Sequence, residues 1–310
     1  MKRILVTGAG GPAGINALKL LSALPEGAEV FGTDIDPMAA GQFFCKEFAL
    51  SARCDNPEAY KASMLELIQR WHIDTILPTV SEELVMIREA LQGVDIAIVL
   101  SAQETIERCH DKREFYRFVT AEAPALMGKW ATADKVDWEA ETYFLKPAFG
   151  RGSRGCRLIT ASELALIAKQ PDAASWIVME PLPGKEWTVD AYIDAAGATA
   201  YVVPRERLQM SGGISSKGKT VHETEVMKRT EALLALLPCH GPVCVQWKQD
   251  ANGVPMLLEM NPRLSGAVTI TALAGANPMA CLLEDLAHGR VNPVEWRDIA
   301  VVRYFEDRIV

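Results

Sequence analysis

The first hundred residues alternate between short apolar runs and segments with one apolar face, which predicts a parallel sheet covered by helices. Apolar runs with the length of buried strands lie at residues 3–7, 30–33, 73–78 and 94–100. Segments with apolar residues at helical spacing lie between them, at 15–24, 57–71 and 82–91. Strands and helices that alternate in this way favour an open parallel sheet with helices on both faces.

Further along the chain the pattern changes to short strands and turns. Strands are predicted at 142–146, 156–159 and 175–180. A helix at 162–169 follows Thr160, which forms a capping box with Glu163. Ser101 and Glu104 form a similar box at the start of an earlier helix. This segment is therefore predicted to form a small α+β unit.

The last part of the chain is predicted to form antiparallel strands joined by turns, at 186–193, 198–204, 242–249 and 254–260. A long helix between the second and third strands has Met227, Leu233, Leu234 and Leu237 on its buried face. We therefore expect an α/β domain followed by two α+β subdomains, with the boundaries 1–104, 105–180 and 181–310.

The composition is that of a globular enzyme and argues against several classes of partner. Of 310 residues, 49% are apolar and 23% are charged, and the formal net charge is -8. We therefore expect neither nucleic acid nor an anionic membrane as a partner. No run approaches the roughly 20 apolar residues that span a bilayer. Seven cysteines without a Cys-x-x-Cys pair favour reduced thiols and a cytoplasmic location.

Cys239, His240 and Cys244 lie close together, which raises the question of a zinc site. A structural zinc needs a fourth ligand at a suitable spacing. We therefore do not expect zinc at this position.

A glycine-rich loop joins the first strand to the first helix. Gly8, Gly10 and Ala13, with Asp34 after the second strand, match the fingerprint of dinucleotide-binding domains. However, the Tyr-x-x-x-Lys pair of short-chain dehydrogenases is absent at every tyrosine. An NAD(P)-binding oxidoreductase therefore stays an alternative. The same loop also fits a plain strand–helix turn, or a site where a small anionic substrate rests on the loop's N–H groups.

Residues 242–261 are predicted to form a hairpin with polar chemistry on one face. Asn252-Gly253 is the favoured pair for a two-residue type I′ turn. That turn places Gln246 directly opposite Glu259, so both side chains project to the same face. Asn261 follows Glu259 by two residues and shares this face. Magnesium prefers such oxygen ligands and keeps further positions for water and phosphate.

The segment after the hairpin supports a metal–phosphate interpretation of this face. Arg263 lies two residues beyond Asn261 and can reach a departing phosphate. A solvated polar face on an edge hairpin is the alternative. The polar loop from Asn261 to Gly266 makes the metal–phosphate interpretation the better one.

These motifs resemble the ATP-grasp superfamily, in order and over nearly the whole chain. Glu259-Met260-Asn261-Pro262-Arg263, with Gln246 upstream, is similar to the carbamoyl-phosphate synthase large subunit, where a Gln, a Glu and an Asn bind the metals. The resemblance implies a Rossmann-like pre-ATP-grasp domain followed by a two-subdomain ATP-grasp fold. The lid subdomain would be 105–180 and the core subdomain 181–310. The chain is much shorter than a carbamoyl-phosphate synthase, so we expect a stand-alone ligase.

The resemblance also implies a nucleotide site. Lys112 and Lys146 look like the family's two phosphate-binding lysines. The loop at 150–155, with Gly152 and Ser153, resembles the glycine loop that closes over the triphosphate. Taken alone, this loop would be interpreted as a mobile surface hairpin.

The segment from Ile177 to Glu186 resembles the family's adenine hinge. Glu180 and Leu182 would contact the adenine. Glu186 would accept hydrogen bonds from the ribose hydroxyls, although a surface strand residue is the alternative interpretation.

The implied activity is an ADP-forming carboxylate–amine ligase with ATP and Mg²⁺ (or Mn²⁺). A carboxylate oxygen attacks the γ-phosphate, and an amine, or less often a thiol or ammonia, then attacks the acyl phosphate. Gln246, Glu259 and Asn261 would hold the metal. Arg263 and Lys146 would stabilise charge on the transferring phosphoryl group.

The substrates are small molecules whose identity the sequence leaves open. Arg205 or Arg207 could hold a substrate carboxylate, or could lie on an exposed basic loop. The candidate substrate contacts are Gly10, Gly11, Glu82, Arg205, Ser211 and Gly213. The chain could form a homodimer. A catalytically silent ATP-binding regulator is a second alternative function.

Overall fold

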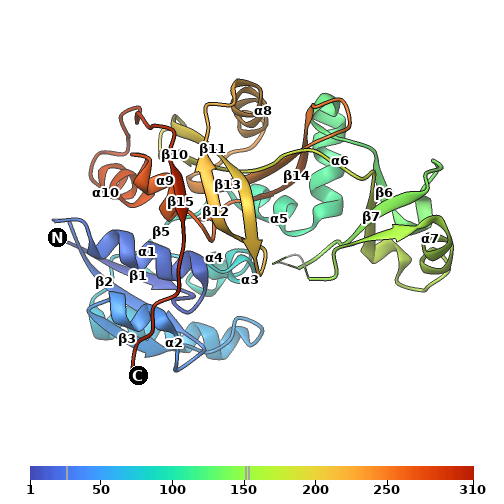
Figure 1. Ribbon diagram of the computed structural model, residues 1–310. Helices are drawn as coiled ribbons and strands as arrows, with labels where there is room; N and C mark the ends of the chain where they lie inside the picture. Colours follow the sequence, from blue (N-terminus) through green and yellow to red (C-terminus); the bar gives the residue numbers. More distant parts are fainter. Residues whose placement is uncertain (26, 151, 153) are drawn as a thin grey trace.

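The computed structural model describes residues 1–310 except Glu26, Arg151 and Ser153, and the described residues form three sheets (Figure 1). The N-terminal sheet is parallel, in the order β3-β2-β1-β4-β5. Its strands are β1 (Lys2–Thr7), β2 (Ala28–Asp34), β3 (Glu47–Leu50), β4 (Thr75–Leu77) and β5 (Ala97–Ile98). The strand order runs both ways from β1, so the carboxyl ends of β1 and β4 form the crevice where such sheets bind ligands.

The helices of this domain are α1 (Pro12–Ser22), the 3₁₀ helix η1 (Ala40–Phe44), α2 (Pro57–Trp71), α3 (Ser81–Leu84) and α4 (Ile87–Ala90). The structure confirms the predicted α/β alternation and corrects its details. The helix predicted at 82–91 is two short helices, α3 and α4. Strand β3 was not predicted, because its apolar run is only three residues long, and it lies half exposed at the edge of the sheet.

The predicted cap at Ser101 is wrong, although a helix, α5 (Gln103–His110), does follow. The residue before this helix is Ala102, which has no side-chain cap. The Ser101 hydroxyl instead accepts a hydrogen bond from the backbone N–H of His240 at 3.1 Å. Ser101 is fully buried, so a contact between distant segments takes the hydroxyl that the local sequence assigned to capping.

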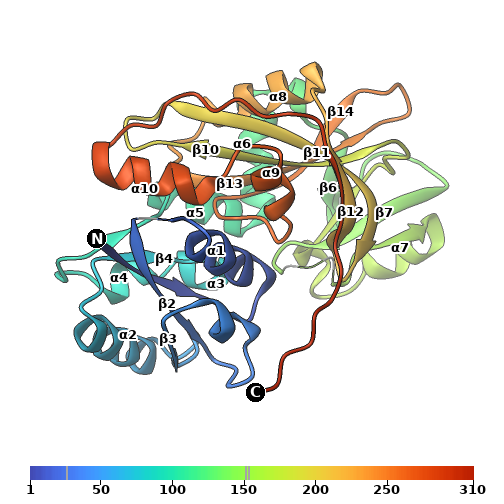
Figure 2. The same cartoon turned by 60° about the vertical axis from the view of Figure 1, so that its left-hand side comes forward.

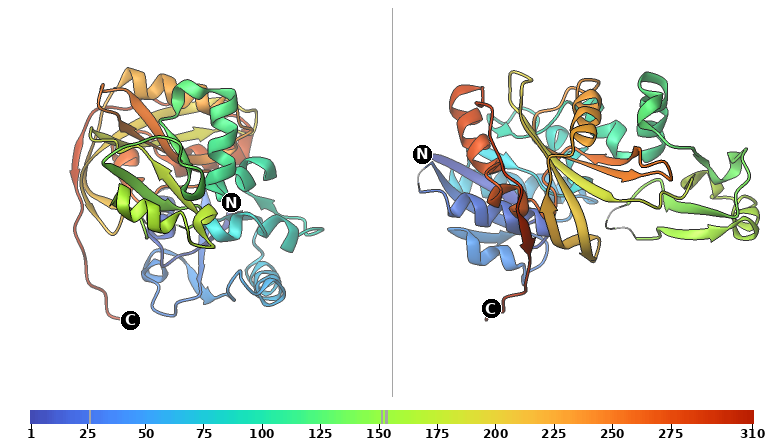
Figure 3. Two further views of the ribbon diagram at one scale, coloured as in Figure 1. Left: turned by 90° about the vertical axis from the view of Figure 1, so that its right-hand side faces the viewer. Right: turned by 45° about the horizontal axis from the view of Figure 1, so that its top comes forward.

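The second sheet belongs to the green segment that projects from the rest of the molecule in Figures 1 and 3. Its order is β6-β9-β7-β8. Its elements are β6 (Trp130–Thr132), β7 (Thr142–Pro147), β8 (Arg157–Thr160), β9 (Trp176–Met179), α7 (Ala161–Ile167) and the 3₁₀ helices η2 (Pro124–Leu126), η3 (Ala133–Lys135) and η4 (Ala173–Ser175). The capping box of Thr160 and Glu163 is confirmed, with hydrogen bonds of 3.3 and 2.8 Å.

The third sheet is the largest, in the order β14-β13-β10-β11-β12-β15. Its strands are β10 (Glu186–Ile193), β11 (Thr199–Ser211), β12 (Ile214–Thr220), β13 (Gly241–Gln249), β14 (Pro255–Asn261) and β15 (Ala300–Val302). Its helices are α6 (Lys112–Glu122), α8 (Thr224–Leu234), α9 (Thr269–Leu273) and α10 (Pro278–His288). None of the described helices is both long and apolar enough to cross a membrane.

The two faces of this sheet pack differently. Trp187 and Trp247 lie on one face, in a core that includes residues of α6 and α8. Tyr192 and Tyr201 lie on the other face, in a core shared with α1 and α10. In Figure 2, α9 and α10 lie between this sheet and the N-terminal domain. Farther along the second face polar side chains replace the apolar ones, and there the candidate site lies.

The hairpin of β13 and β14 has the predicted pairing but not the predicted turn. Gln246 is opposite Glu259, as predicted. Near the turn the register differs by one residue, and a bulge directly after Gln246 restores it. Asp250 is bonded to Val254 (N to O 2.9 Å), so the turn is one residue longer than the predicted Asn252-Gly253 pair. Such turns end in a residue with positive φ, here Gly253 at 83°.

Candidate functional site

A cleft of about 820 Å³ lies between the carboxyl edge of the N-terminal sheet and the polar part of the third sheet. On the N-terminal side it is lined by the glycine loop after β1, the segments after β2 and β4, and Tyr60 of α2. On the other side it is lined by β10, β11, β13 and β14. The cleft therefore joins the crevice of a doubly wound sheet to the predicted metal–phosphate hairpin.

Strand pairing places the chemistry of the second wall in one row across the sheet. Glu259 is opposite Gln246, Gln246 is opposite Thr188, and Thr188 is opposite Arg205. Opposed residues project to the same face, and neighbouring strands lie about 4.8 Å apart. All four residues line the cleft. The row thus runs from a carboxylate and an amide to a guanidinium.

The three predicted metal ligands come together with Arg263. The Asn261 amide donates to Glu259 Oε1 at 3.1 Å, and Arg263 Nη2 donates to Asn261 Oδ1 at 3.5 Å. Arg207 Nη1 donates to Gln246 Oε1 at 3.4 Å. The described residues contain no group of three His, Cys, Asp or Glu side chains that could hold a metal ion. Cation binding here therefore depends on the two amide oxygens and one carboxylate, together with oxygens from a ligand.

Arg263 also ties the hairpin to the N-terminal domain. Its Nε donates to the Ser81 hydroxyl at 2.7 Å, and its Nη1 donates to the carbonyl of Leu264 at 2.7 Å. Ser81 begins α3, the helix that follows the carboxyl end of β4. The guanidinium is thus held at the point where the two domains meet the cleft.

Lys146 lies at the end of β7 and reaches the hairpin from the projecting sheet. Its ammonium donates to the carbonyl of Leu258 at 2.8 Å and to the hydroxyl of Tyr116. Burial lowers the pKa of Lys146 to about 8, although the negative charge of Glu259 acts in the opposite direction. Glu259 therefore contributes to the electrostatic environment of Lys146.

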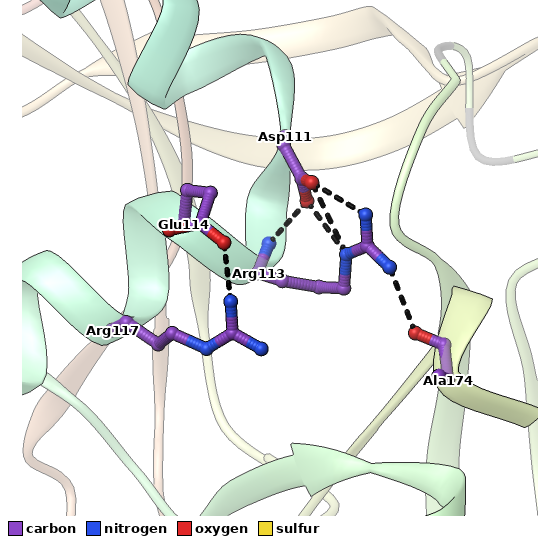
Figure 4. A network of polar contacts seen from close by, with 5 residues as sticks. All are labelled: Asp111, Arg113, Glu114, Arg117 and Ala174. Atoms are coloured by element: carbon purple, nitrogen blue, oxygen red, sulfur yellow. Dashed lines mark hydrogen bonds and ion pairs between the residues drawn. The ribbon is translucent and has the colours of Figure 1, made fainter.

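Lys112, the other predicted phosphate-binding lysine, donates to the carbonyl of Gly150 at 2.9 Å. Next to it, Asp111 caps α6 by accepting from the backbone of Arg113 at 2.9 Å (Figure 4). The Arg113 guanidinium binds Asp111 and reaches the carbonyl of Ala174 at 3.1 Å. These contacts fix the start of α6 beside the projecting sheet.

Gly152 of the predicted glycine loop lies against the turn between β11 and β12. Gly152 lines the cleft with φ of 67°, whereas Ser153 lies outside the described residues. A Cβ built on Gly213, in the turn between β11 and β12, would lie 3.3 Å from the backbone of Gly152. The two glycine turns are therefore in close contact.

The predicted hinge residues lie outside this cleft. Glu180 accepts a hydrogen bond from the backbone of Lys129 at 2.7 Å, and Leu182 is buried. Glu186, at the start of β10, pairs with Arg207 at 2.9 Å and with Lys248 at 3.6 Å. The structure thus brings the metal candidates and all substrate candidates except Ser211 into one cleft, and it leaves the hinge candidates beside that cleft.

On the N-terminal wall, the glycine loop already binds a carboxylate of its own. Gly10 N donates to Asp34 Oδ2 at 2.6 Å, and Gly11 N donates to the carbonyl of Gly8 at 2.9 Å. Asp34 also accepts from Asp36 N at 3.0 Å. The acidic residue of the dinucleotide fingerprint is therefore bound to the loop that would hold the pyrophosphate.

Glu83 and Tyr60 line this wall and were not among the predicted site residues. The Tyr60 hydroxyl donates to Glu83 Oε2 at 3.0 Å, and the Thr7 hydroxyl donates to Glu83 Oε1. Burial raises the pKa of Glu83. The neighbouring candidate Glu82 also lines the cleft. The position of Glu83 after a strand end was a usable signal, but its pairing with α2 was not visible in the sequence.

The arginines expected to hold a carboxylate are strand residues, not members of an exposed loop. Arg205 and Arg207 alternate along β11 and both line the cleft. Strand β12, which follows, was not predicted, because its polar residues show no strand pattern. Gly213 lines the cleft, but Ser211 is exposed and is not one of its lining residues.

Comparison with known proteins identifies the architecture. Residues 172–308 match a family model described as ATP-grasp in the biosynthetic pathway with Ter operon. No curated protein sequence matches the chain. N5-carboxyaminoimidazole synthetase from Staphylococcus aureus, complexed with ADP, has a TM-score of 0.75 and 16% identity, covering 95% of this chain and 80% of that one. L-amino acid ligase from Bacillus licheniformis has a TM-score of 0.71 and 12% identity, covering 94% and 78%.

Pyruvate carboxylase from Rhizobium etli is also similar, with a TM-score of 0.71 and 16% identity. The match covers 92% of this chain but only 28% of that enzyme. At such identities the likeness shows the fold, which is that of ATP-grasp proteins with an N-terminal α/β domain.

Proposed function

We propose that this chain, which belongs to the ATP-grasp superfamily, is an ATP-dependent ligase that joins a small carboxylic acid to an amine through an acyl phosphate. One observation carries the proposal: Gln246, Glu259, Asn261 and Arg263 meet on one wall of a cleft that is large enough for two small substrates. The similar structures include a synthetase with ADP and an L-amino acid ligase, which supports the same class of reaction.

The donor set fits a divalent cation that is shared with a nucleotide. Gln246 and Asn261 offer neutral oxygens, and Glu259 offers a carboxylate. One negative charge holds Mg²⁺ or Mn²⁺ weakly, so nucleotide phosphates would supply the remaining ligands. When bound between Gln246, Glu259 and Asn261, the cation would neutralise charge on the transferring phosphoryl group.

The side chains around this position would bind and orient the phosphates. Lys146 and Lys112 approach from the lid side and Arg263 from the cleft. The acid's carboxylate oxygen attacks the γ-phosphorus, the bond to the bridging oxygen breaks, and ADP leaves. The amine then attacks the acyl carbon, loses a proton, and releases inorganic phosphate. The step needs no protein nucleophile, because positioning and charge stabilisation supply the catalysis.

Each of the three proposed domains contains one of the three sheets. We assign residues 1–104 to the pre-ATP-grasp domain, 105–180 to the lid subdomain and 181–310 to the core subdomain. Glu180, Leu182 and Glu186, where lid and core meet, would hold the adenine and ribose. The N-terminal wall with Gly10 and Glu82 would hold the second substrate.

The oxidoreductase hypothesis finds less support. Its pyrophosphate would need the N–H of Gly10, which is bonded to Asp34 at 2.6 Å. A silent ATP-binding regulator uses the same nucleotide contacts, so only turnover separates it from a ligase.

The decisive experiment is a screen of carboxylate and amine pairs for ADP release, with Mg²⁺ or Mn²⁺. A ligase releases ADP only when a matching acid is present, and Glu259→Ala removes that activity. Glu231→Ala on α8, which removes an exposed carboxylate that does not line the cleft, serves as the matched control. Full activity of Glu259→Ala would refute the metal assignment, and nucleotide binding without turnover with every pair would favour the regulator.

A further inference from the structure

The guanidinium of Arg205 is buried at the cleft with one nitrogen unpaired. Its Nε donates to Asp190 Oδ2 at 2.7 Å, and its Nη2 donates to the Ser265 hydroxyl at 2.8 Å. Its Nη1 has no hydrogen-bond partner among the described residues, although the side chain is only 1% exposed. Unpaired buried donors are rare in native proteins, and each requires an explanation such as a ligand.

The surroundings of Arg205 favour an anion as that ligand. Asp190 balances the charge of Arg205, and Glu186 balances that of Arg207. Arg303 adds a further positive charge near Arg205: burial, and then the positive charge of Arg205, lower the pKa of Arg303. The local charge is therefore positive, and a carboxylate matches the planar donor edge of an arginine.

The distance between Arg205 and the predicted metal site indicates which kind of ligand would bring an anionic group to Arg205. Arg205 and Gln246 belong to one row across the sheet, with Thr188 between them. Their backbones are thus two strand spacings apart, roughly 10 Å. A single small carboxylate cannot occupy both places, whereas a molecule with two carboxylates can.

We propose that Arg205 binds a second, non-reacting carboxylate of the acid substrate, so that the substrate class is a dicarboxylic acid. This proposal rests on the proposed ligase function, in which the first carboxylate is phosphorylated beside Gln246 and Glu259. Ser265, which holds the guanidinium, lines the same cleft. Arg205 lines the cleft although its side chain is only 1% exposed, so on this proposal the carboxylate reaches Nη1 after a small shift of the side chain.

Binding is tested by calorimetry in the presence of Mg·ADP, so that the result does not depend on turnover. The ligands are succinate, glutarate and adipate, each compared with its monoamide. A charge-assisted contact of this kind corresponds to roughly 10- to 100-fold in affinity. At least one diacid should therefore bind about that much more tightly than its monoamide.

The variant Arg205→Lys keeps a positive charge beside Asp190 but loses the fork of donors. It should weaken diacid binding and leave monoamide binding nearly unchanged, so that the preference is lost. The double variant Asp190→Asn with Arg205→Met removes both buried charges and should give the same loss if the single variant is unstable. Lys219→Met is the control for loss of a positive side chain elsewhere on these strands, because Lys219 pairs with Glu206 on the opposite face of β11 and β12.

The experiments distinguish failure of the Arg205 subsite from failure of the proposed ligase function. The subsite is refuted if no diacid is preferred over its monoamide, or if Arg205→Lys weakens both ligands equally, as a purely structural role would. Equally strong competition by inorganic phosphate would refute a carboxylate as the ligand class. The ligase function fails instead if no acid, diacid or otherwise, supports ADP release.

Discussion

Nucleotide binding should take up a proton at Lys146. In the free protein, burial lowers the pKa of this lysine to about 8, and its ammonium donates to the Leu258 carbonyl and the Tyr116 hydroxyl, both uncharged. The proposed function places a nucleotide phosphate beside the same ammonium. A negative charge there stabilises the protonated form, so the pKa must rise when the nucleotide binds.

The size of the effect follows from Coulomb's law. Two unit charges 4 Å apart at an effective dielectric constant of about 20 interact by about 4 kcal/mol. Since about 1.4 kcal/mol corresponds to one pKa unit, this interaction should raise the pKa of Lys146 well above 9. At pH 9, roughly one tenth of the free protein and nearly all of the complex would then have a charged Lys146. Binding should take up about 0.5 proton at pH 8 and about 0.9 at pH 9.

The assay is calorimetric titration with Mg·ADP in two buffers of different ionisation enthalpy, at pH 7, 8 and 9. The number of protons taken up on binding should rise from pH 7 to pH 9 in the wild type, and this uptake should be absent in Lys146→Met. Lys112→Met, which removes the neighbouring lysine of the same proposed phosphate site, should weaken binding but keep the proton count. An uptake near zero at pH 9, or an unchanged uptake in Lys146→Met, would refute the placement of a phosphate at this lysine.

The same pKa has a consequence for the free protein. The unfolded chain has a lysine pKa near 10.5, so between about pH 8 and 10.5 it binds more protons than the folded chain. The contribution of Lys146 to the free energy of unfolding should therefore rise with pH through that window. Lys146→Met should lose this contribution, which chemical denaturation at several pH values would detect.

Three further changes test other parts of the structure. Glu259→Gln should lower acid-dependent ADP release by about 100- to 1,000-fold, since it removes the one carboxylate of the metal site, and added Mn²⁺ should restore little of it. Gly14→Ala should destabilise the fold by about 1–3 kcal/mol in urea unfolding, because its Cβ would lie 2.1 Å from the Gly8 carbonyl oxygen. Gly11→Ala is the control and should destabilise the fold less, because its Cβ would lie 3.3 Å from the same oxygen and its φ is -78°. Glu83→Gln should be more stable than the wild type at neutral pH. Burial raises the pKa of Glu83, so the wild type loses stability as the pH rises from about 4.5 through the raised pKa. A difference in urea midpoint between the two proteins that stays constant over that pH range would contradict this prediction.

Periodicity and local chemistry were enough to predict the α/β start of the chain and the facing pair of Gln246 and Glu259. Both depend on interactions between near neighbours in sequence: alternating apolar positions, and a hairpin closed by a short turn. The turn itself was predicted one residue too short. A bulge compensated for the error, so the facing pair was correct although the register near the turn was not.

The tertiary structure decided which distant groups share one space. The sequence could not show that Arg205 would be buried against Asp190, or that Ser101 would bind His240 and not cap its own helix. Nor could it show that the Asp34 carboxylate binds the Gly10 amide. The sequence alone determines the order of the elements and the types of ligand that they offer. Packing of the three sheets, which no local pattern encodes, decides which of those groups lie buried and close enough to act on one substrate.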